Sequence, residues 1–186
     1  MTKTYKVEGV VLKRVNIGEG DRIITLFTRQ RGKVVGIAKG VRKLTSKRSG
    51  SLEIATRGEF FFYQGKYLDI LTQAQFLSGY QKARQNLIRI TQLHQVLEII
   101  DLLTVENEPA PEVYQVLIST LEALEQPQAQ KKLLLRRITK ILRLMGFTHD
   151  KPFTESGLKH YIEELANRKL RSKDYLSPQT KKISKP

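Results

Sequence analysis

The stretch Val7–Lys39, VEGVVLKRVNIGEGDRIITLFTRQRGKVVGIAK, contains three strand candidates that are rich in β-branched and aromatic residues. They are Val7–Val15, Arg22–Thr28 and Lys33–Lys39, and the two segments that separate them are short and contain glycine. Glycine adopts positive φ without a Cβ clash, so such connections are typical of antiparallel hairpins. The stretch therefore predicts two consecutive hairpins near the start of the chain.

Two further strand candidates, Ile54–Tyr63 and Tyr67–Phe76, are separated by a short turn around Gly65. Five short strands in about 75 residues are too few for a β-sandwich and fit a small closed barrel. An OB-fold is the first candidate for this barrel, and an SH3-like barrel is the nearest competitor.

After Gly79 the hydrophobic residues recur at three- and four-residue steps, which predicts helices in place of strands. Prolines and a glycine mark the helix ends, because proline opens a helix more readily than it continues one and glycine is favoured just after the last turn. The expected helices are Tyr80–Arg89, Thr91–Val105, one that Pro111 opens and Pro127 ends, Gln128–Met145 before Gly146, and Glu155–Asn167.

These patterns predict an α+β protein, with a five-stranded OB-fold β-barrel followed by an α-helical bundle. Residues 1–79 would form an OB-fold nucleic-acid-binding domain and residues 80–170 a helical domain. Residues 171–186, which contain Ser, Lys and two prolines, would form a basic, disordered tail.

Positive charge dominates the chain, with a net charge of +15 over 186 residues and an isoelectric point of about 10.1. Residues 29 to 48 contain no Asp or Glu, and their basic side chains lie on and beside two of the expected strands. Such a strip can follow a phosphate backbone, so the first partner to expect is a polyanion, above all nucleic acid. The alternative is a solvated charged surface. The basic residues of the run are Arg29, Arg31, Lys33, Lys39, Arg42, Lys43, Lys47 and Arg48.

The composition excludes several classes of protein. The sequence has no cysteine, which excludes disulfides, thiolate catalysis, iron–sulfur clusters and the usual structural zinc sites, and fits a reducing cytoplasm. No apolar run approaches the roughly 18 residues that span a bilayer, and no apolar segment follows the N-terminal MTKTYK to serve as a signal peptide. We therefore expect a soluble cytoplasmic protein that does not contact membranes.

No catalytic constellation is evident. Gly18-Glu19-Gly20 begins like a dinucleotide fingerprint, but the third glycine is missing and a strand follows in place of a helix. Neither Gly32-Lys33 nor Gly65-Lys66 precedes Ser or Thr, so there is no P-loop. The three histidines lack metal-ligand spacing, and Glu19 and Asp21 fit turn and salt-bridge roles better than metal binding. The sequence predicts a protein that binds and arranges a partner, not an enzyme, with no cofactor and no metal.

Charge is also divided within the helical part. From residue 93 to 125 there are seven acidic residues and no Lys or Arg, whereas from residue 131 to 143 there are six basic residues and no acid. At about 100° per residue, four of the basic residues share one helix face opposite the apolar side chains. This basic stripe is either a solvated face that pairs with Glu98, Asp101 or Glu122, or a docking surface for an acidic peptide or for nucleic acid. The stripe consists of Lys132, Arg136, Lys140 and Arg143.

Short motifs along the chain match those of a known protein family. In the barrel part they are Glu8–Arg14 (EGVVLKR), Gly18–Thr28 (GEGDRIITLFT), Gly32-Lys33, Ala38–Arg42 (AKGVR) and Leu71–Ala74 (LTQA). In the helical part they are Leu97-Glu98, Leu102-Leu103 before Glu108-Pro109, and Leu144–Phe147 (LMGF). From residue 5 to residue 147 the chain resembles the RecO family of bacterial recombination mediators.

The resemblance implies an OB-fold and a helical domain in a protein of DNA repair and homologous recombination, which works at the nucleoid. Such proteins bind single- and double-stranded DNA, anneal complementary strands, and cooperate with RecR and the single-strand binding protein to load the recombinase. Some members carry a cysteine zinc module after the Gly-Phe position, which this cysteine-free sequence lacks. The segment after Phe147 is also short and matches the family poorly.

Three groups of candidate site residues follow. The candidates for DNA binding are Lys13, Arg14, Arg22, Arg29, Arg31, Lys33, Lys39, Arg42, Lys43, Lys47 and Arg48. The candidates for base stacking are Phe27, Phe61 and Tyr63, because aromatic side chains on a barrel face are typical of OB-folds that bind single strands. The basic stripe is the candidate site for the acidic C-terminal tail of the single-strand binding protein.

Two other functions remain open at this stage. An OB-fold module that binds RNA in translation or RNA handling would carry a similar basic barrel, and only a preference for the 2′-OH would distinguish it. A scaffold that recruits acidic proteins would carry the same charge without touching nucleic acid.

Overall fold

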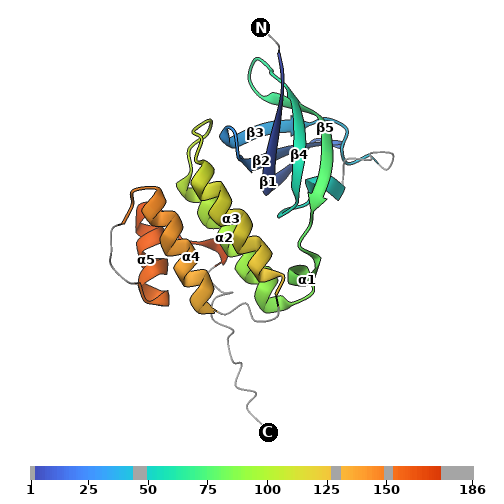
Figure 1. Cartoon of the computed structure of the whole chain (residues 1–186). Helices are drawn as coiled ribbons and strands as arrows, with labels where there is room; N and C mark the ends of the chain where they lie inside the picture. The colour runs from blue at the N-terminus through green and yellow to red at the C-terminus, as the bar shows by residue number, and fades with distance from the viewer. Residues whose placement is uncertain (1–2, 44–49, 127–130, 149–152, 173–186) are drawn as a thin grey trace.

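Five strands at the N-terminal end of the chain form a closed barrel (Figure 1). The strands are β1 Thr4–Ile17, β2 Asp21–Thr28, β3 Gly32–Ala38, β4 Arg57–Tyr63 and β5 Asp69–Ser78. The computed structural model describes residues 3–43, 50–126, 131–148 and 153–172. The barrel order is β1-β2-β3-β5-β4, and only the β3–β5 pair is parallel. This order confirms the predicted OB-fold barrel.

The long first strand serves both sides of the barrel. The N-terminal half of β1 pairs with β4 and its C-terminal half pairs with β2, with an irregularity in the register between Val11 and Lys13. Such a bulge bends a strand, which allows one strand to close a barrel. The strand prediction from Ile54 was wrong at its start, because Ala55 has a φ of 66° and β4 begins only at Arg57.

One glycine makes room for the barrel interior. A Cβ at Gly36 would lie 2.6 Å from the ring of Phe62, which is fully buried with Phe60, Leu26 and Val11. Side chains of the described strands therefore fill the interior of the barrel.

The second half of the described chain is helical, as expected. The helices are α1 Gln81–Arg84, α2 Leu87–Leu103, α3 Pro111–Leu124, α4 Lys131–Leu144 and α5 Glu155–Leu165. The predicted single helix Tyr80–Arg89 was wrong: Asn86 has an extended backbone, and its side chain accepts hydrogen bonds from the N–H groups of Ile88 and Arg89. Asn86 is therefore the N-cap of α2, and Arg89 belongs to that helix.

The predicted end of α4 is confirmed. Gly146 has a φ of 76°, and the N–H of Phe147 bonds the carbonyl of Leu142 at 2.9 Å. This pattern ends a helix with a glycine in the left-handed region.

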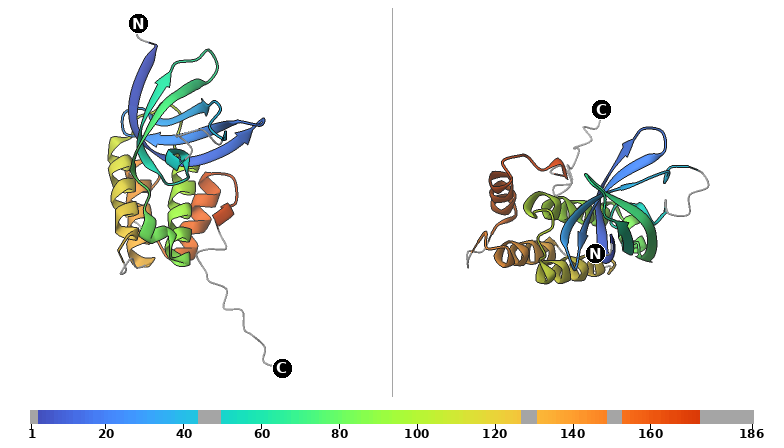
Figure 2. Two further views of the ribbon diagram at one scale, coloured as in Figure 1. Left: turned by 90° about the vertical axis from the view of Figure 1, so that its right-hand side faces the viewer. Right: turned by 90° about the horizontal axis from the view of Figure 1, so that it is seen from above.

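The barrel packs on α2 and α3, and α4 and α5 lie beyond them (Figures 1 and 2). Val10, Leu12 and Phe27 of the barrel are buried in the same hydrophobic cluster as the apolar faces of α2 and α3. The carboxylate of Glu8 accepts a 3.1 Å hydrogen bond from the hydroxyl of Tyr114 on α3 and pairs with Arg57 at 2.6 Å. The barrel and the helices therefore share one core. Over the described residues, no helix is both long and apolar enough to cross a bilayer.

Candidate nucleic-acid interface

The structure divides the predicted basic strip between two ends of the barrel. β2 and β3 pair along their length, so Arg22 lies opposite Ala38 at one end and Thr28 lies opposite Gly32 at the other. At about 3.3 Å per residue, the eight residues of β2 separate the two ends by roughly 23 Å. The described candidates for DNA binding therefore do not form one continuous cluster.

The first cluster surrounds the β1–β2 turn, and we call it the glycine-turn group. The guanidinium of Arg42 donates a 2.9 Å hydrogen bond to the carbonyl of Gly18, and its backbone N–H bonds the carbonyl of Gly20 at 3.0 Å. These bonds hold the segment after β3 against the β1–β2 turn. The glycine-turn group consists of Arg14, Arg22, Lys39, Arg42 and Lys43.

Two of the guanidinium groups of this cluster, those of Arg14 and Arg22, share the carboxylate of Glu53. Glu53 pairs with Arg14 and lies 3.8 Å from the Nη1 atom of Arg22. Within the described residues that Nη1 atom is buried without a hydrogen-bond partner, and the Arg22 side chain is only 12% exposed. Burial lowers the pKa of Arg22, and the positive charges of Arg14 and Arg42 add to this effect. The five cations of the cluster outnumber the nearby carboxylates of Glu19, Asp21 and Glu53, so the cluster has excess positive charge that an anion would stabilise.

The second cluster lies at the β2–β3 turn and contains Arg29, Arg31 and Lys33. Arg29 is exposed, and the guanidinium of Arg31 lies 3.8 Å from the ring centre of Tyr5. Lys33 instead bonds Asp101 on α2, and its side chain is only 13% exposed. The placement of Lys33 at a DNA contact is therefore corrected, because its ammonium joins the barrel to the helices.

Of the remaining basic candidates, the structure describes one. Lys13 is exposed and lines a cavity of about 550 Å³ together with His94 and Arg168. Lys47 and Arg48 lie outside the described residues.

The aromatic candidates differ in exposure. Phe27 has no exposed surface and packs near Tyr114 in the shared core, so it is withdrawn as a base-stacking residue. Phe61 is half-buried with the ammonium of Lys6 at 5.4 Å from its ring centre, and Tyr63 is 39% exposed. The sequence reading missed Tyr67, which is 87% exposed. The sequence does indicate this residue, because the basic–aromatic pair Lys66-Tyr67 directly follows the turn glycine Gly65.

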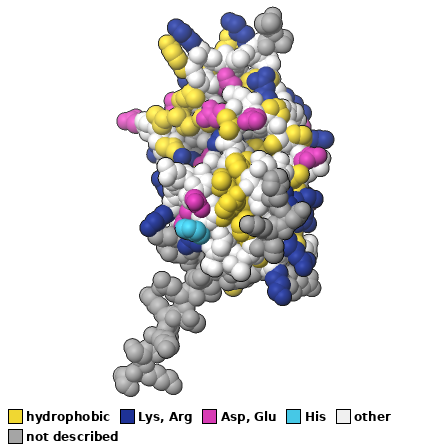
Figure 3. All heavy atoms as spheres, turned by 90° about the vertical axis from the view of Figure 1, so that its left-hand side faces the viewer, with side chains coloured by type: hydrophobic (Ala, Val, Ile, Leu, Met, Phe, Trp, Pro, Cys, Tyr) yellow, Lys and Arg dark blue, Asp and Glu magenta, His cyan; other side chains and the backbone are white. Residues whose placement is uncertain are grey.

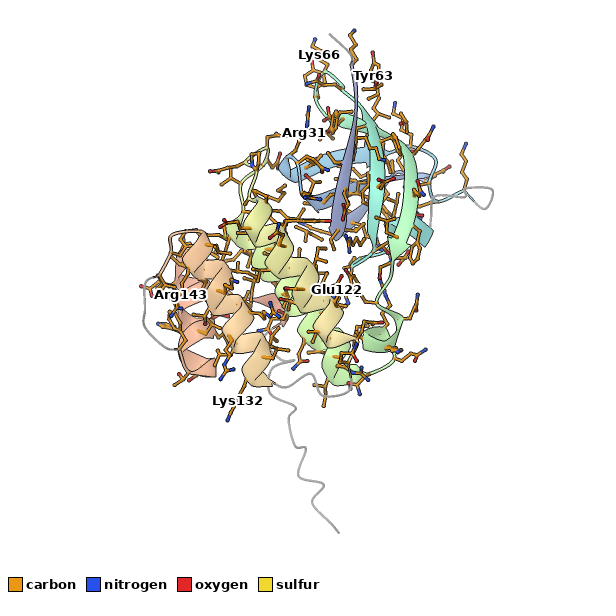
Figure 4. All side chains as sticks on the ribbon, viewed as in Figure 1. Arg31, Tyr63, Lys66, Glu122, Lys132 and Arg143 are labelled. Carbon is orange, nitrogen blue, oxygen red and sulfur yellow. The ribbon has the colours of Figure 1, made fainter. Side chains whose placement is uncertain are left out.

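The basic stripe of α4 lies on the surface of the protein. Lys132, Arg136, Lys140 and Arg143 are all exposed, and the opposite face of the helix is buried through Leu134, Ile138, Ile141 and Leu142. Lys132 and Arg143 mark the two ends of this helix in Figure 4.

The three acids that could have neutralised the stripe have other contacts. Glu122 pairs with Arg57 at 3.5 Å, Asp101 with Lys33 at 3.8 Å, and Glu98 accepts a 2.9 Å hydrogen bond from the N–H of Ser172. These are the contacts of the three acids, and the docking interpretation stays a prediction.

A groove of about 680 Å³ runs beside the stripe. Its basic wall is formed by Arg136, Lys140 and Arg143, and its apolar wall by Leu135, Leu144 and Phe153. On the face that carries α4 and α5, Figure 3 shows an apolar strip with acidic side chains above it and basic ones to its lower right. The groove therefore combines the two features that an acidic peptide with an apolar end requires.

The predicted tail begins at residue 171, and its first two residues are described. The N–H groups of Arg171 and Ser172 both bond the carboxylate of Glu98. Residues 173–186 lie outside the described residues. Across the described residues, no group of three or more His, Cys, Asp or Glu side chains is placed to hold a metal ion.

Comparison with known proteins finds the same family along most of the chain. Residues 1–80 match the family model described as "Recombination protein O N terminal", and residues 84–150 match "Recombination protein O C terminal". The chain is 33% identical over 146 residues to the DNA repair protein RecO of Pelotomaculum thermopropionicum, which covers 78% of this chain and 56% of that protein. It is 34% identical over 147 residues to the DNA repair protein RecO of Bifidobacterium longum, with 77% and 62% covered. The matches thus extend over little more than half the length of these relatives.

Proposed function

This chain belongs to the RecO family of DNA repair proteins, and from that premise we propose that it is a DNA-binding recombination mediator that anneals complementary strands. Its partners in this role are single- and double-stranded DNA, which it arranges without chemical transformation. In this proposal residues 1–79 are the nucleic-acid-binding domain and residues 80–170 the helical domain, and the protein works at the nucleoid.

The glycine-turn group is the observation that carries the proposal. The group gathers three guanidinium and two ammonium groups around the β1–β2 turn, whose own acids are Glu19 and Asp21, and Glu53 contacts Arg14 and Arg22. Arg42 and Lys43 are exposed and provide the direct phosphate contacts, whereas the mostly buried Arg22 contributes through its charge. Such a cluster binds the phosphate backbone without reading base edges, so affinity depends on salt more than on sequence.

Strand annealing follows from the same electrostatics. Two complementary strands repel each other through their phosphates, and neutralising this charge lets their bases meet. The second cluster, around Arg29 and Arg31, lies roughly 23 Å along β2 from the first. Two separated basic clusters on one barrel can each contact a different strand or a different segment of one strand.

The proposed protein partners are RecR and the acidic C-terminal tail of the single-strand binding protein. Family membership is the support for RecR. For the tail, the support is the exposed basic stripe of α4 and the apolar groove beside it. The tail would be bound by charge pairs with the stripe and by an apolar residue of the tail placed in the groove.

Annealing of complementary oligonucleotides coated with single-strand binding protein tests the function. The wild type should accelerate annealing, and the double variant Arg42→Glu/Lys43→Glu should lose most of the acceleration together with single-strand binding. The matched control is Lys82→Glu/Lys169→Glu, which makes the same charge change at two exposed positions outside both basic clusters and should behave as the wild type.

Three results would contradict the proposal. One is wild-type protein that does not accelerate annealing at any salt concentration. Another is a glycine-turn variant that binds DNA as well as the control. A labelled single strand that RNA competes away more effectively than DNA of the same sequence would indicate an RNA-binding module instead.

A further inference from the structure

The β4–β5 turn, residues 64–68, presents an aromatic ring that does not pack against the rest of the protein. Tyr67 is 87% exposed, and Tyr63, at the end of β4, is 39% exposed. The ammonium of Lys66 lies 5.2 Å from the ring centre of Tyr67. An exposed aromatic side chain with an adjacent cation is the pair of groups that binds a base and its phosphate in single-strand binding sites.

The turn is anchored to the barrel. The N–H of Gly65 donates a 3.2 Å hydrogen bond to one carboxylate oxygen of Asp69, and the hydroxyl of Tyr5 donates to the other. The N–H of Gln64 bonds the carbonyl of Lys3 at 2.6 Å. A Cβ at Gly65 would overlap the carbonyl oxygen of Leu68, so the turn is also tight. An anchored platform loses little conformational entropy when a base stacks on it.

The same contacts connect the turn to the second basic cluster. Tyr5 stacks on Phe62 with ring centres 5.3 Å apart, and the guanidinium of Arg31 covers the Tyr5 ring. Figure 4 shows Lys66, Tyr63 and Arg31 at the same upper end of the barrel. A strand whose phosphates pass Arg31 therefore has an exposed ring within the same region.

We propose that the β4–β5 turn is a stacking site for an unpaired base of single-stranded nucleic acid, with Tyr67 as the stacking ring and Lys66 as the phosphate contact. This inference rests on the proposed DNA binding and adds to it the origin of a preference for single strands. Bases of an intact duplex are stacked on one another and do not present a face to Tyr67, whereas the basic clusters contact the phosphates of both forms.

The stacking contact is tested by comparing two proteins on two ligands, one with bases and one without. The wild type and Tyr67→Ala are each titrated with an oligothymidylate and with an abasic deoxyribose-phosphate strand of the same length. Tyr67→Ala should weaken oligothymidylate binding by at least about fivefold. It should leave abasic-strand and blunt-duplex binding unchanged, and it should not alter the slope of affinity against salt because the ring carries no charge.

Two controls separate stacking from a general loss of surface. Tyr67→Phe keeps the ring and should bind as the wild type. Leu87→Ala removes an apolar side chain that is 78% exposed on α2, and it should have no effect.

A fluorescence measurement tests the same contact directly. The chain contains no tryptophan, so Tyr67→Trp provides a unique fluorescence signal. That signal should be quenched by oligothymidylate and not by the abasic strand or the duplex.

The outcomes distinguish the inference from the function on which it rests. Wild-type protein that binds no DNA in a salt-sensitive manner would overturn both. Salt-sensitive binding by the wild type, combined with equal losses of Tyr67→Ala on the oligothymidylate and on the abasic strand, would overturn the stacking site alone.

Discussion

The ammonium of Lys33 on β3 donates a 2.6 Å hydrogen bond to the backbone carbonyl of Asp101 on α2 and lies 3.8 Å from the carboxylate of the same residue. The backbone of this region is joined as well, because the N–H of Asn107 bonds the carbonyl of Lys33 at 2.9 Å. A lysine that the charge pattern assigned to DNA binding thus fixes the barrel against the helices.

The first prediction separates this structural role from DNA binding. Lys33→Met keeps the aliphatic chain and removes the ammonium, which leaves the Asp101 carbonyl without its charged donor. We expect the free energy of unfolding to fall by roughly 1–3 kcal/mol and the salt slope of DNA binding to stay unchanged. Chemical denaturation and salt titration measure the two effects. Lys43→Met is the control: it should alter stability by less than about 0.5 kcal/mol and weaken DNA binding. If Lys33→Met had normal stability but bound DNA weakly, Lys33 would be a DNA contact and not a structural link.

The second prediction concerns the β2–β3 turn, where Gly32 has a φ of 65° and a Cβ would overlap the carbonyl oxygen of Glu108. Gly18 has a similar φ of 52°, but a Cβ there would meet nothing within 4 Å. Alanine at Gly18 should therefore cost only the left-handed backbone strain, about 1–2 kcal/mol. Alanine at Gly32 should cost at least about 2 kcal/mol more, because it also separates the turn from the α2–α3 connection. Equal losses in denaturant unfolding would show that this contact is not tight.

The local features of the barrel were predictable because glycine marks its turns. Gly18 and Gly32 lie where the chain requires positive φ, and the strands around them begin and end within a few residues of the expected positions. Ala55 and Asn86 were missed because an alanine with positive φ has no sequence signal and because an Asn N-cap resembles any other polar residue between two helical segments.

The candidate site was less predictable because its contacts are distant in sequence. Lys33 and Asp101 are 68 residues apart, so the charge run alone could not indicate that this lysine is already bound. Phe27 lies in a strand that is buried on both faces between the barrel interior and the helices, so alternation could not separate core from surface. The exposed Tyr67 follows a simple local pattern and could have been found.

The third prediction is a steep dependence of single-strand binding on salt. We count five cations of the two clusters as phosphate contacts and leave out Arg14, Arg22 and Lys33, which contact Glu53 or Asp101. At about 0.7 per phosphate contact, the plot of log K against log salt should have a slope near −3.5, and Arg42→Gln/Lys43→Gln should reduce it to about −2.1. Oligothymidylate and mixed sequences should bind within a few-fold of each other. A nearly flat plot would show that these cations do not contact phosphates. The five are Arg29, Arg31, Lys39, Arg42 and Lys43.

The fourth prediction concerns pH and the contact between Glu98 and the segment after α5. Burial opposes ionisation of Glu98, but hydrogen bonds from the hydroxyl and N–H of Ser172 and from the N–H of Arg171 outweigh it, so the pKa is lowered overall. The folded protein therefore binds fewer protons here than the unfolded chain near pH 4, and the stabilisation is full above the ordinary glutamate pKa. It is lost as the pH falls through the lowered value.

Glu98→Gln should accordingly be less stable than the wild type at pH 7, and the difference should shrink below about pH 4. Denaturant unfolding across pH 3–7 measures this. For Glu19→Gln, at an exposed turn position, the difference in stability from the wild type should not shrink in this way at low pH. A difference between Glu98→Gln and wild type that stays constant with pH would show that the Glu98 carboxylate does not hold Arg171 and Ser172.

The last prediction concerns the groove beside α4. Each exposed charge pair contributes only about 0.5 kcal/mol, so the basic stripe alone is too weak for micromolar binding of an acidic tail, which requires about 8 kcal/mol. The apolar wall must supply much of the remainder, and Leu144 and Phe153 lie beside Arg136 and Lys140 in one groove. An acidic peptide that ends in an apolar residue should therefore need both walls.

Titration of a labelled acidic tail peptide measures both contributions. Lys132→Glu/Arg136→Glu/Lys140→Glu should abolish binding, and Phe153→Ala should weaken it at least tenfold, with little change in the salt dependence that remains. Lys82→Glu/Lys159→Glu/Lys169→Glu makes the same charge change outside α4 and should bind as the wild type. All four proteins are first compared by denaturant unfolding, because a stripe variant that loses its fold would indicate that the stripe pairs with acids inside the bundle. A folded stripe variant that binds the peptide as tightly as the charge-matched control would place the tail site elsewhere on the protein.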